Sequence, residues 1–311
     1  MRFFLASLAA GIVITACAAP QARAEAEWQL VWSDEFEGET IDSTKWGFEI
    51  DCWGGGNDER QCYTDNSRNA SVKDGKLVIT ARKETATGPA LPERLREEGK
   101  KLSLATKPFT SARMTTSGRA AWRYGKIEVR AKLPQGQGTW PAIWMLPEKN
   151  QYGRWAASGE IDILEAVNLG VDCKSCVGGR ESKILGTLHF GGEWPDNKFD
   201  STEIDFPAVL DGYHIFAIEW RKGTINWLVD GLVFASKQAT DWSTTGTKDP
   251  DAPFDQPFHL ILNLAIGGGL PEGRNDKGIS LNDFPKEMLV DWVRVYQCSS
   301  DPETGEACAN Q

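Results

Sequence analysis

The sequence lacks the patterns that mark several large classes of protein. Its 311 residues contain no internal repeat, no coiled-coil heptad pattern and no long helical periodicity, which excludes repeat solenoids and coiled coils. Positive charge is also scarce, with 34 Lys and Arg against 44 Asp and Glu and a net charge of −10. Nucleic acids and anionic lipid surfaces select for basic patches, so we expect neither as a partner. A neutral substrate fits this balance better than a polyanionic one.

An uncharged apolar run, Phe3–Ala16, follows Arg2 at the N-terminus. It is too short to span a bilayer, so it predicts a signal segment over residues 1–24 and no transmembrane span. Two cleavage sites stay open. One is the small-residue site Ala22-Arg23-Ala24, and the other is Ile14-Thr15-Ala16-Cys17, which resembles a bacterial lipobox. We therefore expect an exported protein, either secreted or an outer-membrane lipoprotein acylated at Cys17, with residues 25–311 as one monomeric domain.

Six of the seven cysteines fall into pairs that are close in sequence once Cys17 is set aside. In an exported protein these favour the disulfides 52–62, 173–176 and 298–308, although six cysteines formally allow fifteen pairings. The C-x-x-C spacing of Cys173 and Cys176 is also typical of thiol redox proteins. No βαβ pattern surrounds it, and we expect a disulfide that tightens a loop.

Short β-prone runs separated by Gly, Pro, Asp and Asn dominate the rest of the chain, which is typical of an antiparallel all-β sandwich. The expected strands are Lys76–Arg82, Ser111–Thr116, Lys126–Leu133, Ala142–Leu146, Glu160–Val167, Ile184–Phe190, His214–Trp220, Thr224–Val229, Leu232–Ser236, His259–Ile266 and Leu289–Gln297. Asp230-Gly231 predicts a type I′ hairpin turn. The charged stretch Thr85–Lys107 interrupts the β pattern; we expect an exposed excursion, either a short helix or a loop, that borders the site.

Three carboxylates occupy six residues of one apolar strand: Glu160, Asp162 and Glu165. Side chains alternate along a strand, so Glu160 and Asp162 share a face, whereas Glu165 falls on the opposite one. A β-bulge of one residue between Asp162 and Glu165 would return Glu165 to the same face. The two glutamates then lie roughly 13 Å apart at Cα, and their side chains must lean together to reach the ~5–5.5 Å of a retaining glycosidase.

Two non-catalytic roles for this cluster stay open from the residues alone. It fits a charged strand that faces solvent, and it also fits a calcium site, since clustered carboxylates are the ligands that calcium prefers. As a catalytic site, one carboxyl must be ionised and another protonated, which mutual repulsion between neighbouring carboxylates favours.

Motifs along the chain resemble glycoside hydrolase family 16, and within it the bacterial laminarinase-like endo-β-1,3-glucanases. They occur in the family's order from residue 28 to about 297 and comprise Trp32–Phe36, Gly55–Gln61, Asp74–Leu77, Thr110–Arg113, Tyr124–Glu128, Gly138–Pro147, Gly159–Glu165, Gly186–His189, Ile261–Gly268 and Val290–Tyr296. The resemblance implies a concanavalin-like β-jelly-roll of two antiparallel sheets with an open substrate cleft. It makes Glu160 the nucleophile, Glu165 the acid/base and Asp162 an assisting carboxylate.

The resemblance also implies residues that bind β-glucan and a metal. The candidates for the glycone side and the flanking subsites are Asn57, Arg113, Trp140, Trp144, Trp155 and His189. It implies no catalytic cofactor, but a structural calcium is held by the carbonyls of Glu35 and Gly75 together with Asp291.

Several of these residues have structural alternatives. Trp144 and Trp292 are equally suited to the core of a β sandwich, and Arg113 to a salt bridge. Asp291 is also suited to a polar position on a strand face. His214 and His259, in apolar strands, are expected to be structural. The run Asn57-Asp58-Glu59-Arg60 departs from the family's usual Asn-Asn-Glu-Leu, which leaves the sugar contacts there open.

The function expected from these observations is endo-acting, retaining hydrolysis of laminarin-type β-1,3-glucan. One alternative is a non-catalytic glucan-recognition protein, which is expected to lack one or both glutamates. Another is the same chemistry on mixed-linkage glucan, agarose, carrageenan or a transglycosylation substrate. A thiol oxidoreductase built on Cys173 and Cys176 is the third.

Overall fold

The computed structural model describes residues 26–309. The predicted signal segment and Cys17 lie outside the described residues. None of the helices in the described part is long and apolar enough to cross a membrane.

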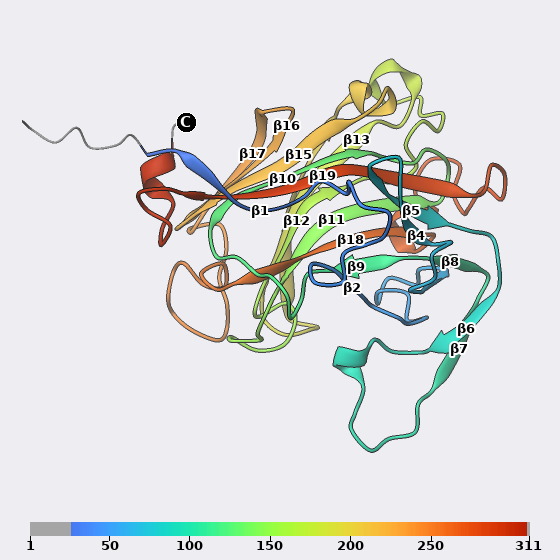
Figure 1. Ribbon diagram of the computed structural model, residues 1–311, viewed down its shortest axis with the longest axis horizontal. Coiled ribbons are helices and arrows are strands. Elements are labelled where there is room, and N and C mark those ends of the chain that lie inside the picture. The colour runs from blue at the N-terminus through green and yellow to red at the C-terminus, as the bar shows by residue number, and fades with distance from the viewer. Residues whose placement is uncertain (1–25, 310–311) are drawn as a thin grey trace, which may run out of the picture.

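Two antiparallel sheets stack face to face to form the body of the molecule (Figure 1). One, named here the β10 sheet, has the order β17-β16-β15-β10-β19-β5-β4, and β1 also pairs with β19. Its strands are β1 (Trp28–Asp34), β4 (Ala70–Lys73), β5 (Lys76–Ala81), β10 (Gly125–Lys132), β15 (His214–Arg221), β16 (Thr224–Val229), β17 (Leu232–Gln238) and β19 (Lys286–Cys298).

The other, named here the β12 sheet, has the order β14-β13-β12-β11-β18-β9-β2. Its strands are β2 (Gly47–Phe48), β9 (Arg113–Thr115), β11 (Thr139–Pro147), β12 (Glu160–Glu165), β13 (Lys183–Gly191), β14 (Asn197–Asp205) and β18 (Phe258–Ile266). Smaller elements are the pairs β3 (Gln61–Tyr63) with β8 (Phe109–Ser111) and β6 (Ala86–Pro89) with β7 (Leu104–Lys107), the helix α1 (Gly269–Glu272) and the 3-10 turns η1 (Glu93–Leu95), η2 (Val177–Gly179), η3 (Pro207–Leu210) and η4 (Glu306–Cys308).

The core lies between the two sheets and follows the alternation of the sequence. In β10, Ile127, Val129 and Ala131 are fully buried while the residues between them are not. Every residue of β18, an inner strand of the β12 sheet, is buried. Apolar burial of this kind contributes about 25 cal/mol per Å², so the apolar faces of the two sheets turn toward each other.

Most predicted strands are confirmed with shifts of one to three residues at their ends, but one predicted strand was wrong. The stretch Ser111–Thr116 is not one strand: the chain passes from β8 to β9 at Ala112, so its two halves join different sheets. Thr85–Lys107 is the exposed excursion that was expected, and it takes the form of the β6–β7 hairpin with the short turn η1 in its loop.

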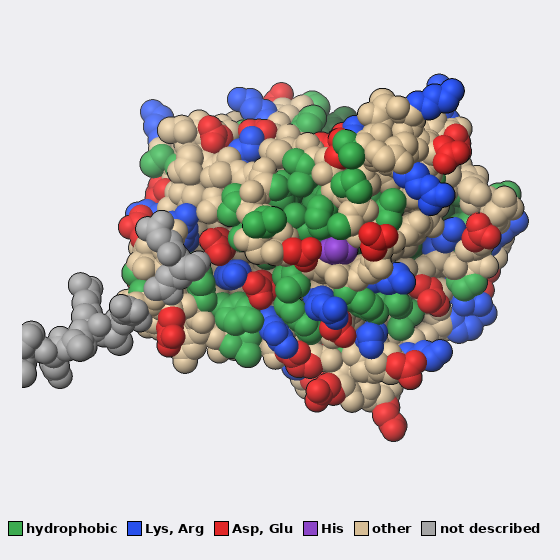
Figure 2. Space-filling model, turned by 90° about the horizontal axis from the view of Figure 1, so that it is seen from above, with side chains coloured by type: hydrophobic (Ala, Val, Ile, Leu, Met, Phe, Trp, Pro, Cys, Tyr) green, Lys and Arg blue, Asp and Glu red, His purple; other side chains and the backbone are tan. Residues whose placement is uncertain are grey.

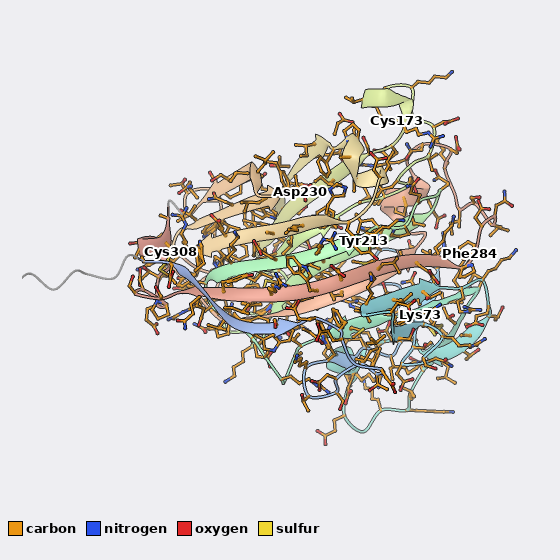
Figure 3. The ribbon with its side chains drawn as sticks, turned by 45° about the horizontal axis from the view of Figure 1, so that its top comes forward. Lys73, Cys173, Tyr213, Asp230, Phe284 and Cys308 are labelled. Atoms are coloured by element: carbon orange, nitrogen blue, oxygen red, sulfur yellow. A yellow bond between two sulfur atoms is a disulfide. The ribbon has the colours of Figure 1, made fainter. Side chains whose placement is uncertain are left out.

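The local constraints expected from the sequence are confirmed. Disulfides join Cys52 to Cys62, Cys173 to Cys176 and Cys298 to Cys308. Asp230 and Gly231 both have positive φ, at 49° and 78°, as a type I′ turn requires. Figure 3 shows Cys173 on a loop that projects from one end of the molecule, and Cys308 near the opposite end.

Acidic, basic and hydrophobic side chains are interspersed on the face that Figure 2 shows.

Candidate active site

The three carboxylates lie on the face of the β12 sheet that points away from the core, named here the open face. In the β12–β13 register, Glu160 pairs with His189 and Asp162 with Thr187, but Glu165 pairs with Leu185. Three steps along β12 therefore match two along β13, so one residue of β12 is bulged out. The bulge confirms the prediction and returns Glu165 to the face of Asp162.

Indole N–H groups hold the two glutamates. Trp155, in the loop before β12, donates its Nε1–H to Glu160 Oε2 at 2.6 Å. Trp140, on β11, donates to Glu165 Oε1 at 3.0 Å, and the Thr187 hydroxyl lies 3.5 Å from the other oxygen of Glu165. Each glutamate therefore has a fixed orientation before any substrate is present.

Asp162 and His189 form the centre of the site. His189 Nε2 lies 3.4 Å from Asp162 Oδ2 and 3.8 Å from Glu160 Oε1. Burial alone would lower the pKa of His189, but the charges of Glu160, Asp162 and Glu165 outweigh it and raise that pKa to about 9. The imidazole is therefore a cation near neutral pH and offsets part of the carboxylate charge.

Burial raises the pKa of two carboxyl groups. The pKa of Asp162 lies well above its usual range because the side chain is buried and is repelled by Glu160 and Glu165. The pKa of Glu165 is raised chiefly by burial, against the opposing charge of His189. Glu165 is thus suited to carry a proton that it gives up during a reaction.

The sequence-predicted substrate residues occupy two sides of this trio. Trp144 is half-buried on the open face, opposite Asp162 in the β11–β12 register, and donates to Asn263 Oδ1 at 2.6 Å. This places Trp144 at the site and not in the core. Arg113 is 4% exposed and lies over the Trp144 ring, 4.5 Å from its centroid. Arg113 also has the salt bridge foreseen as an alternative, with Glu49 at 3.3 Å.

Asn57 lies at a different edge of the site. Its carbonyl accepts from Gly269 N at 2.9 Å, and its amide donates weakly to Glu59 at 3.3 Å. Asn57 and Trp140 both pack closely against Gly268. A Cβ built on this glycine would lie 3.0 Å from the Asn57 carbonyl oxygen and 3.3 Å from the Trp140 ring.

The other histidines have the structural partners expected of them. His214 bonds Asp230 and the Ala208 carbonyl, both at 2.7 Å. His259 pairs with Glu148 at 3.0 Å. Trp292 is not in the core: it is half-buried in the β10 sheet, and Arg294 lies 4.2 Å from its ring centroid.

The three residues of the predicted calcium site approach one another through the strand register. β1 ends at Asp34 opposite Val293, and Leu77 of β5 lies opposite Val290, both along the same side of β19. Glu35 and Gly75 therefore flank the interval that contains Asp291. The Asp291 carboxylate pairs with Arg130 through Oδ2, and the Glu35 carboxylate with Arg294. Backbone carbonyls and one carboxylate oxygen are ligands that suit calcium, and calcium at this place stays a prediction.

Sequence reasoning did not single out Glu49, Thr187 or Phe199. Phe199 of β14 is 67% exposed, pairs with His189 in register and lies 5.9 Å from its ring. The polar composition of β14 carries no strand signal, so only the sheet register brings Phe199 into line with Glu160 and His189.

A β sandwich that displays oriented carboxylates between tryptophans on an open face defines a carbohydrate-active site of the glycosidase class. A family model described as "Beta-porphyranase A-D, GH16 domain" matches residues 28–298. The chain belongs to glycoside hydrolase family 16.

Known glucanases resemble this chain over most of its length. The glucan endo-1,3-beta-glucosidase of Cryptopygus antarcticus is 41% identical over 281 residues, which cover 87% of this chain and 94% of that protein. The glucan endo-1,3-beta-glucosidase A1 of Niallia circulans is 39% identical over 290 residues, and the matched part covers 89% of this chain but only 39% of that protein. The X-ray structure of the laminarinase from Rhodothermus marinus superposes with a TM-score of 0.70 at 36% identity, covering 88% of this chain and 98% of that one.

Proposed function

We propose that this protein is an endo-acting retaining glycosidase that cleaves β-1,3-glucan of the laminarin type. The observation that carries the proposal is the bulge in β12, which brings Glu160 and Glu165 to one face, each oriented by an indole N–H. The names of the relatives favour β-1,3-glucan as the substrate.

The geometry supports a double displacement. Glu160 attacks the anomeric carbon and forms a glycosyl ester, while Glu165 gives its proton to the departing glycosidic oxygen. Glu165 then takes a proton from a water molecule, whose oxygen attacks the anomeric carbon and releases Glu160. His189 balances the charge of Glu160 before it attacks and after it is released, and Asp162 lies beside His189 and positions it. Burial raises the pKa of Glu165, which favours the protonated form that an acid needs at the start of the cycle.

Tryptophan and polar side chains suit a neutral polysaccharide. The flat indole faces of Trp140, Trp144 and Trp155 pack against pyranose C–H groups, while Asn57, Arg113 and His189 hold hydroxyls.

We further propose that the protein is exported and acts as a monomer. Light scattering of the purified protein and fractionation of the producing cells test these two points.

The deciding experiment compares hydrolysis of laminarin, lichenan, agarose, carrageenan and porphyran by the wild type and by Glu160→Ser. We expect β-1,3-oligosaccharides from laminarin, retention at the new anomeric centre by NMR, and a loss on the order of 10³-fold or more in the variant. Glu128→Gln changes a carboxylate of the β10 sheet that pairs with Lys126, and it is the matched control that should keep full activity.

The panel also separates the competing functions. Binding of laminarin without hydrolysis of any substrate identifies a recognition protein and overturns the proposal. Release of galactan fragments, which the description of the family model makes a real alternative, keeps the chemistry and replaces the substrate.

A further inference from the structure

The β6–β7 hairpin and its loop, residues 86–107, lie outside both sheets. Figure 1 shows them projecting from the body, with the loop curling back below β9 and β2 in that view. β2 is the edge strand of the β12 sheet, and the hairpin contacts the segment that directly follows β2.

Contacts at several points fix the hairpin to the segment that follows β2. Cys52 N donates to the Pro89 carbonyl at 2.6 Å, and Lys107 Nζ donates to the Glu59 carbonyl at 2.8 Å. Arg96 donates to the Ile50 carbonyl at 3.1 Å. The Cys52–Cys62 disulfide holds the surface on which the hairpin rests. The loop therefore has a defined position beside the open face.

The side chain that this loop brings to the site is Arg94 of η1. Its Nε lies 3.5 Å from Glu49 Oε1, and its guanidinium lies 5.5 Å from the centroid of the Trp53 ring. The other oxygen of Glu49 pairs with Arg113 at 3.3 Å. Glu49 thus links an inner arginine, 4% exposed, to an outer one whose side chain is 39% exposed.

These pairs continue a line of contacts that begins at the carboxylates. Asp162 lies opposite Trp144 in the sheet, Arg113 lies over Trp144, and Glu49 joins Arg113 to Arg94. The electrostatics agree with this placement: burial lowers the pKa of Arg94, while the charges of Glu49 and Glu160 oppose that change.

Trp53 and Glu49 orient the Arg94 guanidinium without using all of its donors. A Cβ at Gly56 would lie 3.2 Å from the Trp53 ring, so the chain packs directly against that indole and holds it. A guanidinium has five N–H donors, and in the described part of the chain Arg94 has one ion pair and one contact with an aromatic ring. Some N–H groups of the Arg94 guanidinium therefore remain available to a ligand on its solvent-exposed side.

We infer that Arg94 forms a further sugar-binding subsite at the outer end of the open face, beyond Arg113. It donates to the hydroxyls of a neutral pyranose several units from the cleavage point, and Trp53 and Glu49 are its positioning residues. The inference rests on the proposed function, in which Arg113 holds a hydroxyl of the bound polysaccharide. The β6–β7 hairpin thereby makes the enzyme sensitive to the length of the chain it cleaves.

The test measures binding and hydrolysis of β-1,3-linked oligosaccharides from the disaccharide to the heptasaccharide. Binding is measured by calorimetry on Glu160→Gln and on Glu160→Gln with Arg94→Ala. We expect about tenfold weaker binding of the longest oligosaccharides without Arg94, and no change for the shortest ones, which do not reach it. In the otherwise wild-type enzyme, Arg94→Ala should lower kcat/KM with the same dependence on length.

Arg123→Ala is the matched control, because the Arg123 side chain is also 39% exposed and pairs with Glu303, in the segment after β19. It should leave both the binding and its length dependence unchanged. Equal losses at every length, or no loss with Arg94→Ala, would overturn the inference. If the protein binds the oligosaccharides with this length dependence but the wild type does not hydrolyse them, the proposed function is wrong and the subsite is retained. Preferential binding of a sulfated oligosaccharide through Arg94 would refute a subsite for neutral sugar.

Discussion

At the scale of single residues, one imidazole controls the charge of the site. His189 faces Glu160 and Asp162 within 4 Å and is a cation up to a pKa of about 9. Its charge lowers the pKa of Glu165, which burial raises. His189, on the neighbouring strand β13, therefore influences the pKa of Glu165, the proposed acid.

Replacing this imidazole should move the pH profile of the reaction. In His189→Gln the opposing charge is gone, so the pKa of Glu165 rises further and the alkaline limb of kcat/KM shifts to higher pH. We also expect kcat to fall about 10- to 100-fold, because Glu160 loses a neighbour that balances its charge. Profiles of kcat/KM against pH test this, with His214→Gln on β15 as the control. An unmoved alkaline limb would contradict the charge coupling.

The same histidine should make folding stability depend on pH. Its pKa is raised in the folded state, from an ordinary value of 6.5 to about 9. Its stabilising contribution is therefore complete below about pH 6.5 and declines as the pH rises to about 9. The free energy of unfolding should fall more steeply in the wild type than in His189→Gln across this window, by on the order of 2–3 kcal/mol. Denaturant titrations at pH 6 and pH 10 measure the difference, and parallel curves would argue against it.

At the scale of elements, disulfides between residues close in sequence constrain the loops, whereas the strands of the β12 sheet hold the catalytic carboxylates. The Cys173–Cys176 disulfide closes a projecting loop next to η2 (Figure 3). Glu181, at the end of that loop, accepts from Asn275 at 2.9 Å, and Asn275 also bonds Asn168. Glu181 thus joins the loop that the disulfide closes to the loop that carries Asn275.

Removing this disulfide should lower stability and spare catalysis. For a closed loop this short, the chain-entropy estimate is about 2 kcal/mol, or a few degrees in Tm for a protein of this size. We expect the Cys173→Ser, Cys176→Ser double variant to unfold at a lower temperature with unchanged kcat on laminarin. Calorimetry and initial rates measure the two quantities. Loss of hydrolysis at full stability would instead favour a thiol oxidoreductase built on the C-x-x-C pair.

At the scale of the whole molecule, distant segments meet where β1 and β5 end against β19. The stretches around Glu35 and Gly75 are brought to Asp291 only by the pairing of three strands. A cation bound there would join the N-terminal strand to the C-terminal one and stabilise the folded state by linkage.

Calcium should therefore raise Tm relative to EDTA. At a hundredfold excess over its Kd, a ligand that binds only the folded state contributes about 2.7 kcal/mol. The response should vanish in Asp291→Asn and persist in Asp211→Asn, a control at the end of η3. Because Asp291 also pairs with Arg130, the decisive quantity is the calcium-dependent change in Tm and not Tm itself. A wild type that melts identically in calcium and in EDTA would exclude the site.

The sequence alone determined the local features of this protein. The alternation in β10, the Asp230-Gly231 turn, the three disulfide pairs and the bulge before Glu165 follow from residues close to one another in the chain. The carboxylate trio was recognisable for the same reason, since its members share one strand.

Only the tertiary structure decided which strands became neighbours and what their side chains contact. The polar strand β14 pairs in spite of its composition, and the chain around Ala112 divides between two sheets. The contacts of His189 with Asp162 and of Arg94 with Glu49 join residues that are tens of positions apart. Such contacts depend on strand register and sheet order, which arise from burial across the whole sandwich and leave no trace in any short stretch of sequence.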